Sequence, residues 1–448
     1  MTRRAVLRQI LDAAIDSGRG DRLLQVHSDV VEDCWIYRHA DQSIHVPLPE
    51  HNGVGRIVVV GAGKAAGALV VGLEGKLGSR IDRGAVIVKF GHGVATHRVR
   101  VLEAAHPVPD AAGAAATQVL LGLLADLTPH DLVFVLLTGG ASALMVAPAP
   151  GLALADKLAV HRVLVRSAAN IQEINVVRKH LSAVKGGQLP RYLGGATVVT
   201  LAISDVLGDD PATIASGPTV ADPSTYADAL AVLAKHDLVA QIPVPVLGHL
   251  RRGAAGNIAE TPKPAQWPPQ AYAPLIIASN RGALAAAANA GRRLELEVQV
   301  YPQPLDGDTH AAAQGFARWL RQRLATRATQ QPLLLLGGGE TTLTVRGDGR
   351  GGRCQEFALV AAEALRDLRR FTLLAAGTDG TDGPTAAAGA WVDDSSLTRA
   401  AARGLAPEGY LKRNDSYNFF EPLGDLLVTG PTGTNVLDLV AAIIQPES

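Results

Sequence analysis

Charged and hydroxyl side chains in this sequence recur in glycine-rich loops that follow short apolar runs. Gly61-Ala-Gly63-Lys64 follows the apolar run of residues 56–60, and Thr138-Gly139-Gly140-Ala-Ser142 follows the run of residues 132–137. Glycine lets a ligand approach the backbone closely, and the N–H groups at the start of a following helix attract anions. Each loop therefore predicts an anion-binding turn, with a lysine beside the first one. An ordinary tight turn with a helix cap is the alternative.

The second half of the chain shows the same pattern three more times. Apolar runs at 333–336, 372–376 and 426–428 lead into glycine-rich loops that carry threonine and polar or acidic side chains. Arg353 opens an expected helix, where its guanidinium could fork onto a carboxylate or a phosphate. We expect the loops of both halves to surround a phosphorylated ligand. The candidate nucleotide-binding residues are Gly61, Gly63, Gly139, Gly140, Ser142, Gly338, Glu340, Thr341, Thr378, Asp379, Thr432 and Asn435.

A carboxylate and two basic groups complete the candidate chemistry. Asp205 follows the apolar run of residues 198–203, where a carboxylate can hold Mg²⁺ or accept a proton from an alcohol. Arg178 and Lys185 share one face of an expected helix, and this face could meet a phosphate, a carboxylate or only solvent. Ser216 adds a hydroxyl in a further glycine-containing loop. The sequence leaves open whether Asp205 acts as a base or as a metal ligand.

The composition argues against several classes of protein. The chain has 448 residues, 47% of them hydrophobic, which suits two domains or one large domain. Its 42 basic and 42 acidic side chains balance, so we expect no basic surface for nucleic acid. No apolar run reaches the roughly 18 residues of a membrane span, and the first residues lack a signal-peptide pattern. Cys34 and Cys354 lie far apart, so we expect no cysteine metal site and a reducing, cytoplasmic setting.

Alternating strand and helix patterns predict an α/β fold with two domains, each with a mainly parallel sheet flanked by helices. We expect an N-terminal Rossmann-like domain over 1–240, a proline-rich connecting segment over 241–274 and a C-terminal domain over 275–448. The expected strands lie at 56–60, 85–90, 131–137, 197–203, 275–278, 297–301 and 332–336. The expected helices lie at 5–17, 64–77, 111–126, 153–169, 172–186, 281–292 and 309–325.

The loop at residues 61–66 fits known nucleotide-binding motifs only in part. It matches the loose dinucleotide pattern G-x-G-x-x-A after a strand and before a helix. The acidic residue expected at the end of the next strand is absent, since Lys89 stands there. The loop is not a Walker motif either, because Val58 and Ala65 replace that motif's first glycine and its hydroxyl residue. What remains is an anion-binding loop with Lys64 beside it.

Together these motifs resemble the glycerate 2-kinases whose C-terminal part is called the MOFRL domain. The matching stretches include GAGKAA (61–66), LTGGASAL (137–144), INVVRKHLSAVKGGQL (174–189), ISDVLGDDPATIASGPTVADPST (203–225), GGRCQEFAL (351–359), AAGTDGTDGPTAAAGA (375–390) and TGPTGTNVLDL (429–439), and the resemblance spans nearly the whole chain. It implies transfer of the γ-phosphoryl group of ATP, with Mg²⁺, to the 2-hydroxyl of D-glycerate. It also implies two α/β domains with the active site in the cleft between them.

The resemblance gives roles to particular residues. By motif match, the family's functional lysine, aspartate and arginine fall on Lys64, Asp205 and Arg353. Lys64 would neutralise charge on the transferring phosphate, and Arg353 would anchor the glycerate carboxylate. Cys354 stands where the family usually has asparagine, which removes a side-chain amide next to Arg353. The expected substrate-binding residues are Arg178, Lys185, Ser216 and Arg353, and the expected metal ligands are Asp205 and Asp379.

Three functions compete for this sequence. The first is a glycerate 2-kinase, with D-glycerate and ATP as small-molecule partners, no nucleic acid, no membrane, and a homodimer left open. The second is an NAD(P)H-dependent hydroxypyruvate reductase, a label that family members often carry, which rests on the dinucleotide pattern alone. The third is a non-catalytic sugar-phosphate sensor. A sensor would normally carry an effector or nucleic-acid-binding element, and the sequence shows neither.

Overall fold

The structure of the chain, a computed structural model, describes residues 1–39, 42–50, 54–268, 271–326 and 331–445. The chain divides into two compact units. The central unit is Gly20–Ile277, and the split unit combines Met1–Arg19 with Ala278–Ser448. No helix in these described ranges is long and apolar enough to cross a membrane.

The central unit is built on a six-stranded sheet in the order β6-β5-β4-β7-β8-β9. Its strands are β4 (Ile57–Ala62), β5 (Ile81–Lys89), β6 (Val99–Ala104), β7 (Leu132–Leu137), β8 (Thr197–Ile203) and β9 (Leu275–Ala278). Strands β4 to β8 pair in parallel, and every residue of β4 and β7 is buried, as expected for a sheet covered on both faces. Numbered along the chain, the strand order is 3-2-1-4-5-6, which is that of doubly wound dinucleotide-binding domains. Ligands of such sheets bind where the order reverses, here at the carboxyl ends of β4 and β7.

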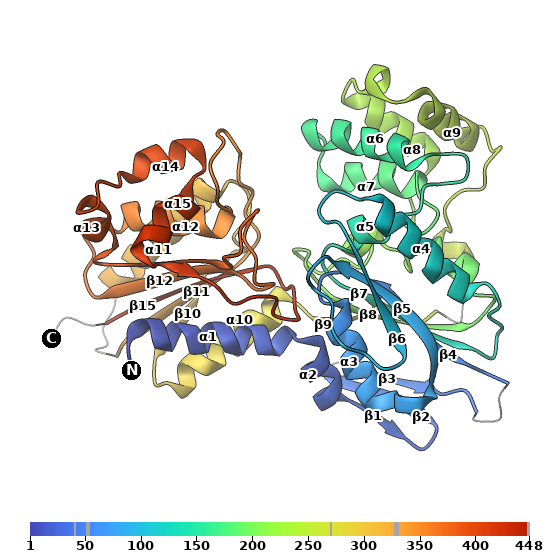
Figure 1. Ribbon diagram of the computed structural model, residues 1–448, viewed down its shortest axis with the longest axis horizontal. Helices are drawn as coiled ribbons and strands as arrows, with labels where there is room; N and C mark the ends of the chain where they lie inside the picture. Colours follow the sequence, from blue (N-terminus) through green and yellow to red (C-terminus); the bar gives the residue numbers. More distant parts are fainter. Residues whose placement is uncertain (40–41, 51–53, 269–270, 327–330, 446–448) are drawn as a thin grey trace. The chain divides into compact units, whose positions relative to one another are not determined.

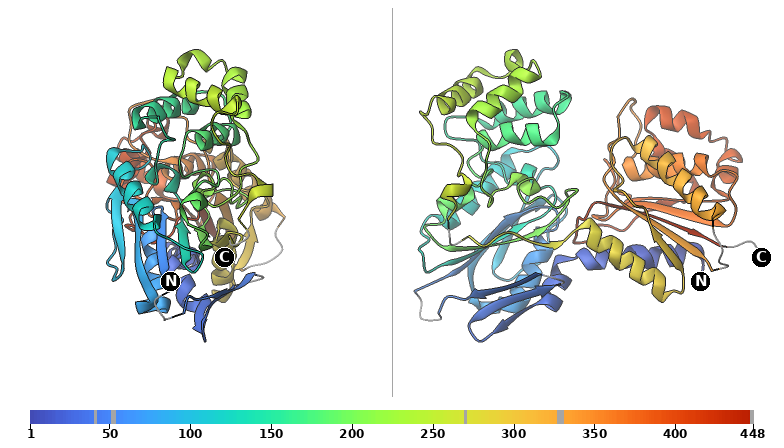
Figure 2. Two further views of the ribbon diagram at one scale, coloured as in Figure 1. Left: turned by 90° about the vertical axis from the view of Figure 1, so that its right-hand side faces the viewer. Right: turned by 180° about the vertical axis from the view of Figure 1, so that it is seen from behind.

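Helices cover both faces of this sheet (Figures 1 and 2). One face carries α3 (Ala66–Leu77), which packs against α2 (Gly20–His27), and the other carries α4 (Ala111–Leu124) and the short α5 (Ala141–Leu144). Beside α2 lies a small antiparallel sheet that the sequence did not predict, formed by β1 (Ser28–Val31), β2 (Cys34–His39) and β3 (Gln42–Pro47). A separate helical layer has its own apolar core and consists of α6 (Leu154–Arg166), α7 (Ile171–His180), α8 (Tyr226–Lys235) and α9 (Val244–Ala254).

A buried carboxylate fixes the amino-terminal edge of the sheet. Asp131 precedes β7, is 1% exposed, and accepts hydrogen bonds from the N–H groups of Arg56 and Thr128, each at 2.7 Å. Its carboxylate also pairs with the guanidinium of Arg56 at 2.9 Å. Burial by itself would raise the pKa of Asp131, but these hydrogen bonds outweigh it and lower the pKa from 3.8 to about 2.

We expect Asp131→Ala to lower the free energy of unfolding by about 3 kcal/mol at pH 7. The change leaves the N–H groups of Arg56 and Thr128 without their acceptor and the Arg56 guanidinium without its buried partner. Since the pKa is lower in the folded state, the ionised carboxylate stabilises the protein above pH 3.8, and this stabilisation is lost as the pH falls from 3.8 toward 2. Urea denaturation of wild type and variant at several pH values measures both effects. Asp126→Ala is the control, since Asp126 pairs with the same Arg56 but is 59% exposed; an equal loss there would contradict the role of burial.

The split unit contains a mixed sheet in the order β10-β11-β15-β12-β13-β14. Its strands are β10 (Glu297–Val300), β11 (Leu333–Gly339), β12 (Phe371–Gly377), β13 (Gly389–Asp393), β14 (Leu426–Leu427) and β15 (Asp438–Ile444). The prediction of two α/β domains is confirmed, but the prediction that the second sheet is mainly parallel is wrong. Only β10 and β11 pair in parallel. The last strand, β15, inserts antiparallel between β11 and β12, and β13 and β14 continue the sheet as antiparallel strands.

Helices flank the mixed sheet on both faces, as Figure 2 shows for this unit. One face carries α1 (Arg3–Gly18) and α10 (Asn280–Arg293). The other face carries α11 (Thr309–Ala325) and α12 (Arg353–Ala364), followed by α13 (Ser396–Ala401), α14 (Pro407–Arg413) and α15 (Ser416–Phe420). Phe316, Phe357 and Phe419 are among the residues that fill the core between these helices and the sheet.

The expected domain boundaries differ from the observed units at two places. The helix α1, expected in the N-terminal domain, belongs to the split unit, where Arg4 pairs with Asp393 at 2.8 Å and Asp425 at 2.7 Å. Residues 241–274, expected to be a connecting segment, belong to the central unit and contain α9. The prolines mislead here because Pro245 occupies the first turn of α9, where its missing N–H is tolerated.

Candidate functional site

Two glycine-rich loops are joined where the strand order of the central sheet reverses. The Lys64 N–H donates to the Gly139 carbonyl at 2.8 Å, and the Ala65 N–H donates to Thr138 Oγ1 at 3.0 Å. A side chain at Gly63, whose φ is +132°, would place its Cβ 2.0 Å from Thr138 Oγ1. Only glycine therefore lets the two loops approach this closely. The backbone that carries Lys64 is fixed by these contacts.

A histidine joins Lys64 beside the second loop. A Cβ built on Gly140 would lie 2.9 Å from His106 Cδ2 and 3.5 Å from Lys64 Cγ, so both side chains pack over this glycine. Gly61 has a different place from the one predicted, because it lies inside β4, where a Cβ would meet the Leu136 carbonyl oxygen at 2.1 Å. Gly61 serves strand packing, and Gly63, Gly139 and Gly140 form the loops.

Three of the predicted residues meet in one hydrogen-bonded network. Lys185 Nζ donates to the Ser142 carbonyl at 2.7 Å and to Ser142 Oγ at 2.9 Å, and Ser142 Oγ lies 2.9 Å from Ser216 Oγ. Ser216 Oγ in turn donates to Asn175 Oδ1 at 3.3 Å. The expected helix over 172–186 ends at His180, so Lys185 reaches this network from the turn that follows α7. Lys185 is only 1% exposed.

Basic side chains of α6 lie beside Arg178. Arg178 Nη2 donates to His161 Nδ1 at 2.7 Å, and Lys157 Nζ donates to the Leu181 carbonyl at 3.3 Å. The sequence reasoning missed Lys157 and His161. Their spacing of four residues within a helix was a signal that both side chains share one face, but a solvated face has the same spacing.

Asp205 follows β8, which is the strand next to β7 in the sheet. Its side chain is half-buried. The structure therefore places Lys64, Ser142 and Asp205 in segments that follow adjacent strands at the same edge of the sheet. Asp210 in the same loop has a local role, since its carboxylate accepts hydrogen bonds from Thr213 Oγ1 at 2.7 Å and from the Ala212 N–H at 3.0 Å.

In the split unit, two protein carboxylates already hold the guanidinium of Arg353. Its Nε donates to Asp438 Oδ2 at 2.6 Å and its Nη2 to Asp438 Oδ1 at 3.0 Å, while Nη1 lies 2.6 Å from Glu340 Oε1. Burial would lower the pKa of Arg353, but the charges of Asp438 and Glu340 outweigh it and raise the pKa above its usual value. The predicted fork onto a carboxylate exists, but the carboxylate belongs to Asp438, which the sequence reasoning did not select.

The start of α12 holds a third carboxylate. Asp382 is buried and accepts hydrogen bonds from the N–H groups of Cys354 at 3.1 Å and Gln355 at 2.8 Å. Burial raises the pKa of Asp382 to about 7 despite these donors, and the charge of Asp438 adds to the shift. The thiol of Cys354 is buried in the apolar core, which raises its pKa, and it borders a cavity of only about 10 Å³ that also touches Arg353. That space is smaller than a nucleotide or a glycerate molecule.

The remaining predicted residues of the split unit mostly connect its loops. Thr432 Oγ1 donates to the Thr378 carbonyl at 2.6 Å, and Thr378 Oγ1 donates to the Leu437 carbonyl at 2.6 Å. Thr341 Oγ1 accepts from Thr309 Oγ1 at 3.0 Å, and a Cβ on Gly338 would strike Asn280. Asp379 Oδ1 accepts from the Thr381 N–H at 2.9 Å. Asn435 is half-buried. The threonine hydroxyls are thus engaged within the protein.

No group of three or more metal-binding side chains occurs among the described residues.

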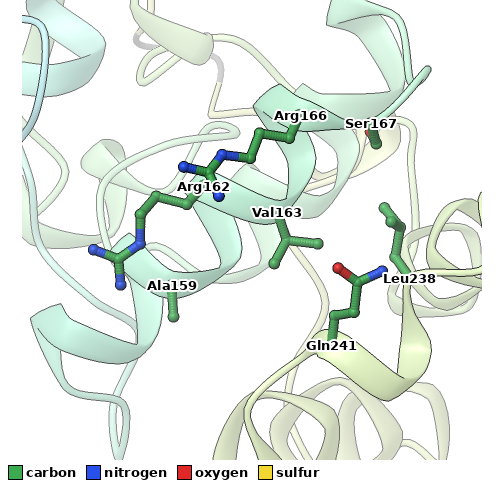
Figure 3. A pocket seen from close by; sticks show the side chains of 7 residues that line it. All are labelled: Ala159, Arg162, Val163, Arg166, Ser167, Leu238 and Gln241. Carbon is green, nitrogen blue, oxygen red and sulfur yellow. The ribbon is translucent and has the colours of Figure 1, made fainter.

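A separate hollow of about 360 Å³ opens beside α6, and Figure 3 shows its lining. The residues that line it are Ala159, Arg162, Val163, Arg166, Ser167, Leu238 and Gln241, and none of them was predicted as a site residue.

The doubly wound central sheet with anion-type loops at its reversal point, together with the mixed α/β unit, defines a two-unit α/β protein built to bind a phosphorylated ligand. Residues 6–251 match the family model of a domain of unknown function, DUF4147, and residues 333–438 match the MOFRL family. The chain belongs to the MOFRL-containing family of glycerate 2-kinases, as its relatives also show.

A glycerate 2-kinase from Pyrococcus horikoshii is 38% identical over 90% of this chain and 91% of its own length. A relative from Agrobacterium vitis, provisionally named a hydroxypyruvate reductase, is 40% identical over 98% of this chain and 94% of its own length. The crystal structure of a glycerate kinase from Thermotoga maritima superposes with a TM-score of 0.82 at 35% identity, covering 98% of this chain and 99% of that one.

Proposed function

We propose that the protein transfers the γ-phosphoryl group of ATP to the 2-hydroxyl of D-glycerate and releases 2-phosphoglycerate and ADP. The observation that carries this proposal is the position of Lys64, fixed by backbone hydrogen bonds beside the Thr138 loop at the reversal point of a doubly wound sheet. Phosphoryl transfer needs positioning and charge neutralisation more than covalent chemistry, and a fixed lysine among backbone donors supplies both.

Each unit contributes residues to the proposed reaction. Lys64 neutralises charge on the transferring phosphate, and Asp205 accepts the hydroxyl proton or holds the metal ion. The loops of the split unit that contain Glu340, Asp379 and Asn435 bind the nucleotide. Arg353, paired with Asp438 and Glu340, holds these loops in place, so its proposed role changes from carboxylate anchor to support of the nucleotide loops.

Magnesium binding is part of the proposal, and the acidic groups of the split unit fit it. A Cβ on Gly377 would lie 3.4 Å from Asp379 Oδ1 and 3.5 Å from Asp438 Oδ1, so two carboxylate oxygens approach the same glycine. Mg²⁺ is commonly held by one or two carboxylates together with phosphate oxygens. We propose Asp379 as a ligand, with Asp205 as the second candidate. The ion would neutralise phosphate charge when bound.

We expect Asp379→Asn to raise the Mg²⁺ concentration that gives half-maximal activity by about tenfold or more, because an amide replaces an anionic ligand. Initial rates at fixed ATP and varied Mg²⁺ measure this. Asp348→Asn is a control in the same unit, since Asp348 has no assigned role in the site. An unchanged Mg²⁺ dependence for Asp379→Asn would remove Asp379 from the metal site.

The activity itself is tested by incubating the protein with D-glycerate, ATP and Mg²⁺ and separating the phosphoglycerate isomers. We expect 2-phosphoglycerate as the product. Formation of 3-phosphoglycerate alone, or of neither isomer, would contradict the proposal.

A hydroxypyruvate reductase is the second candidate, favoured by the strand order of the central sheet and by the loop at residues 61–66. Lys89 ends β5, where a dinucleotide-binding domain would place an acidic residue for the ribose, so we favour the kinase. NADH and NADPH oxidation in the presence of hydroxypyruvate decides between them, and we expect none.

A cytoplasmic location and a homodimer are further proposals, which cell fractionation and sedimentation of the purified protein test.

A further inference from the structure

Four basic side chains of the central unit gather without an acidic partner. Lys157 and His161 come from α6, Arg178 comes from α7, and Lys185 comes from the turn after α7. We call them the basic quartet. Among the described residues, no carboxylate forms an ion pair with any of the four. Their hydrogen bonds go to neutral groups, namely the Leu181 carbonyl, the Ser142 carbonyl and hydroxyl, and the His161 ring.

This arrangement is costly in the absence of a ligand. Lys185 is 1% exposed, and buried cations are normally paired. Other basic groups of the same unit are paired: Lys179 meets Asp222 at 3.4 Å, and Lys235 meets Glu173 at 2.6 Å. The quartet therefore differs from its neighbours in lacking a negative charge, which an anionic ligand would supply.

The quartet can be reached by a ligand and is oriented for one. Lys157, His161 and Arg178 each retain partial exposure, while Lys185 forms the buried floor. A guanidinium has no acceptor, so His161 Nδ1 must accept the bond from Arg178 and the ring proton lies on Nε2. Lys185 links the quartet to Ser142, in the helix that begins after the Gly139–Gly140 loop.

The substrate of the proposed reaction needs such a partner. D-Glycerate carries one carboxylate, and the residue first expected to hold it, Arg353, is engaged by Asp438 and Glu340. We propose that the basic quartet binds the carboxylate of the acceptor substrate, with Lys157 and His161 as substrate-anchoring residues in addition to Arg178 and Lys185. This assignment rests on the proposed glycerate phosphorylation.

The charges within the quartet have a consequence for pH dependence. Burial lowers the pKa of Lys157 to about 7, with the charge of Arg178 acting in the same direction. Burial also lowers the pKa of Lys185, and the charges of Lys157 and Arg178 add to the effect. The pKa of His161 is lowered by burial and by the charges of Arg178 and Arg162. A bound carboxylate favours the charged forms of Lys157 and Lys185, so binding takes up a proton near pH 7 and weakens as the pH rises above 7.

The test compares Lys157→Met with Arg162→Met. Both variants remove one positive charge from α6, but Arg162 is exposed and lies outside the quartet. We expect Lys157→Met to raise both the Kd and the KM for D-glycerate about 10- to 100-fold, the loss of one charge-assisted hydrogen bond, with kcat within about threefold of wild type. Arg162→Met should change the affinity far less than Lys157→Met, because Arg162 acts on the quartet only through the pKa of His161. Lys157→Arg should restore most of the affinity. Thermal unfolding checks that each variant is folded.

Calorimetric titration without ATP separates the quartet from catalysis. D-Glycerate should bind wild type with uptake of a proton at pH 7.5, measured in two buffers of different ionisation enthalpy, and glycerol, which lacks the carboxylate, should not bind. Equal Kd values for D-glycerate in Lys157→Met and Arg162→Met would overturn the inference. So would a loss of affinity for inorganic phosphate or ATP with unchanged affinity for D-glycerate, since the quartet would then be a phosphate site. If wild type binds D-glycerate through Lys157 but forms no phosphoglycerate, the anchor stands and the kinase proposal fails.

Discussion

Lys64→Ala is expected to lower kcat by about 100- to 1,000-fold, the usual effect of removing one fixed group that stabilises charge in a transition state. The backbone N–H groups of Lys64 and Ala65 donate hydrogen bonds to the Thr138 loop, and these bonds do not involve the lysine side chain. The loop should therefore keep its shape, and the KM for D-glycerate should change little. Steady-state kinetics with thermal unfolding as a check on folding measure this.

Lys76→Ala provides the matched control for Lys64. Lys76 lies in the last turn of α3, the helix that follows Lys64, so the same change is made in the same segment but away from the loop. We expect its kcat to equal that of wild type. A Lys64→Ala enzyme with wild-type kcat would remove the lysine from the mechanism and leave the kinase proposal dependent on family membership.

Arg353→Met is expected to abolish measurable turnover and to lower the free energy of unfolding by about 3 kcal/mol. Removing the Arg353 guanidinium leaves the carboxylates of Asp438 and Glu340 without their cation. Buried Asp382 lies close enough to Asp438 to interact with it. Mutual repulsion of these carboxylates should disturb the loops after β11 and β12. Urea denaturation and initial-rate assays measure the two losses separately.

A second substitution tells support of the fold apart from a role in the reaction. In Arg353→Met with Asp438→Asn, the more buried of the two unpaired carboxylates is neutralised, so most of the lost stability should return while activity does not. If the single Arg353→Met variant keeps its free energy of unfolding and loses only activity, the pairing with Asp438 does not stabilise the fold. If the double variant recovers activity, Arg353 has no part in nucleotide binding or transfer.

The strands β4 and β7 were predictable because each is fully apolar and leads into a glycine-rich loop, so the local sequence contains the needed signal. The edge strand β6 contains Arg100 and Glu103 and was not predicted. The position of β15 could not be predicted, because a strand that begins at Asp438 can pair with any open edge of a sheet. Nothing in the neighbouring sequence indicates insertion between β11 and β12. Asp438 was missed for the same reason, because it meets Arg353 across 85 residues of sequence. Such long-range pairing is set by tertiary packing and leaves no local pattern.

The candidate site shows the same difference between residues that are contiguous in the sequence and residues that tertiary packing brings together. The Lys64 loop could be predicted because its residues are contiguous and their geometry follows from a strand that leads into a helix. The basic quartet joins two helices and a turn, and the sequence cannot tell its helical face from a solvated one. Arg353 was predicted to fork onto a carboxylate or phosphate of the ligand, and in the structure it forks onto Asp438. The residue type alone does not say whether a carboxylate partner comes from a ligand or from the protein.

The split unit has a consequence for how the chain is made. The helix α1 is synthesised before the central unit, yet it packs against α10 and the mixed sheet, whose residues follow the central unit in the chain. Leu7, Ile10 and Leu11, each fully buried in the finished protein, must stay exposed while the whole central unit emerges and folds. The nascent chain therefore exposes the apolar face of α1 until the split unit is complete.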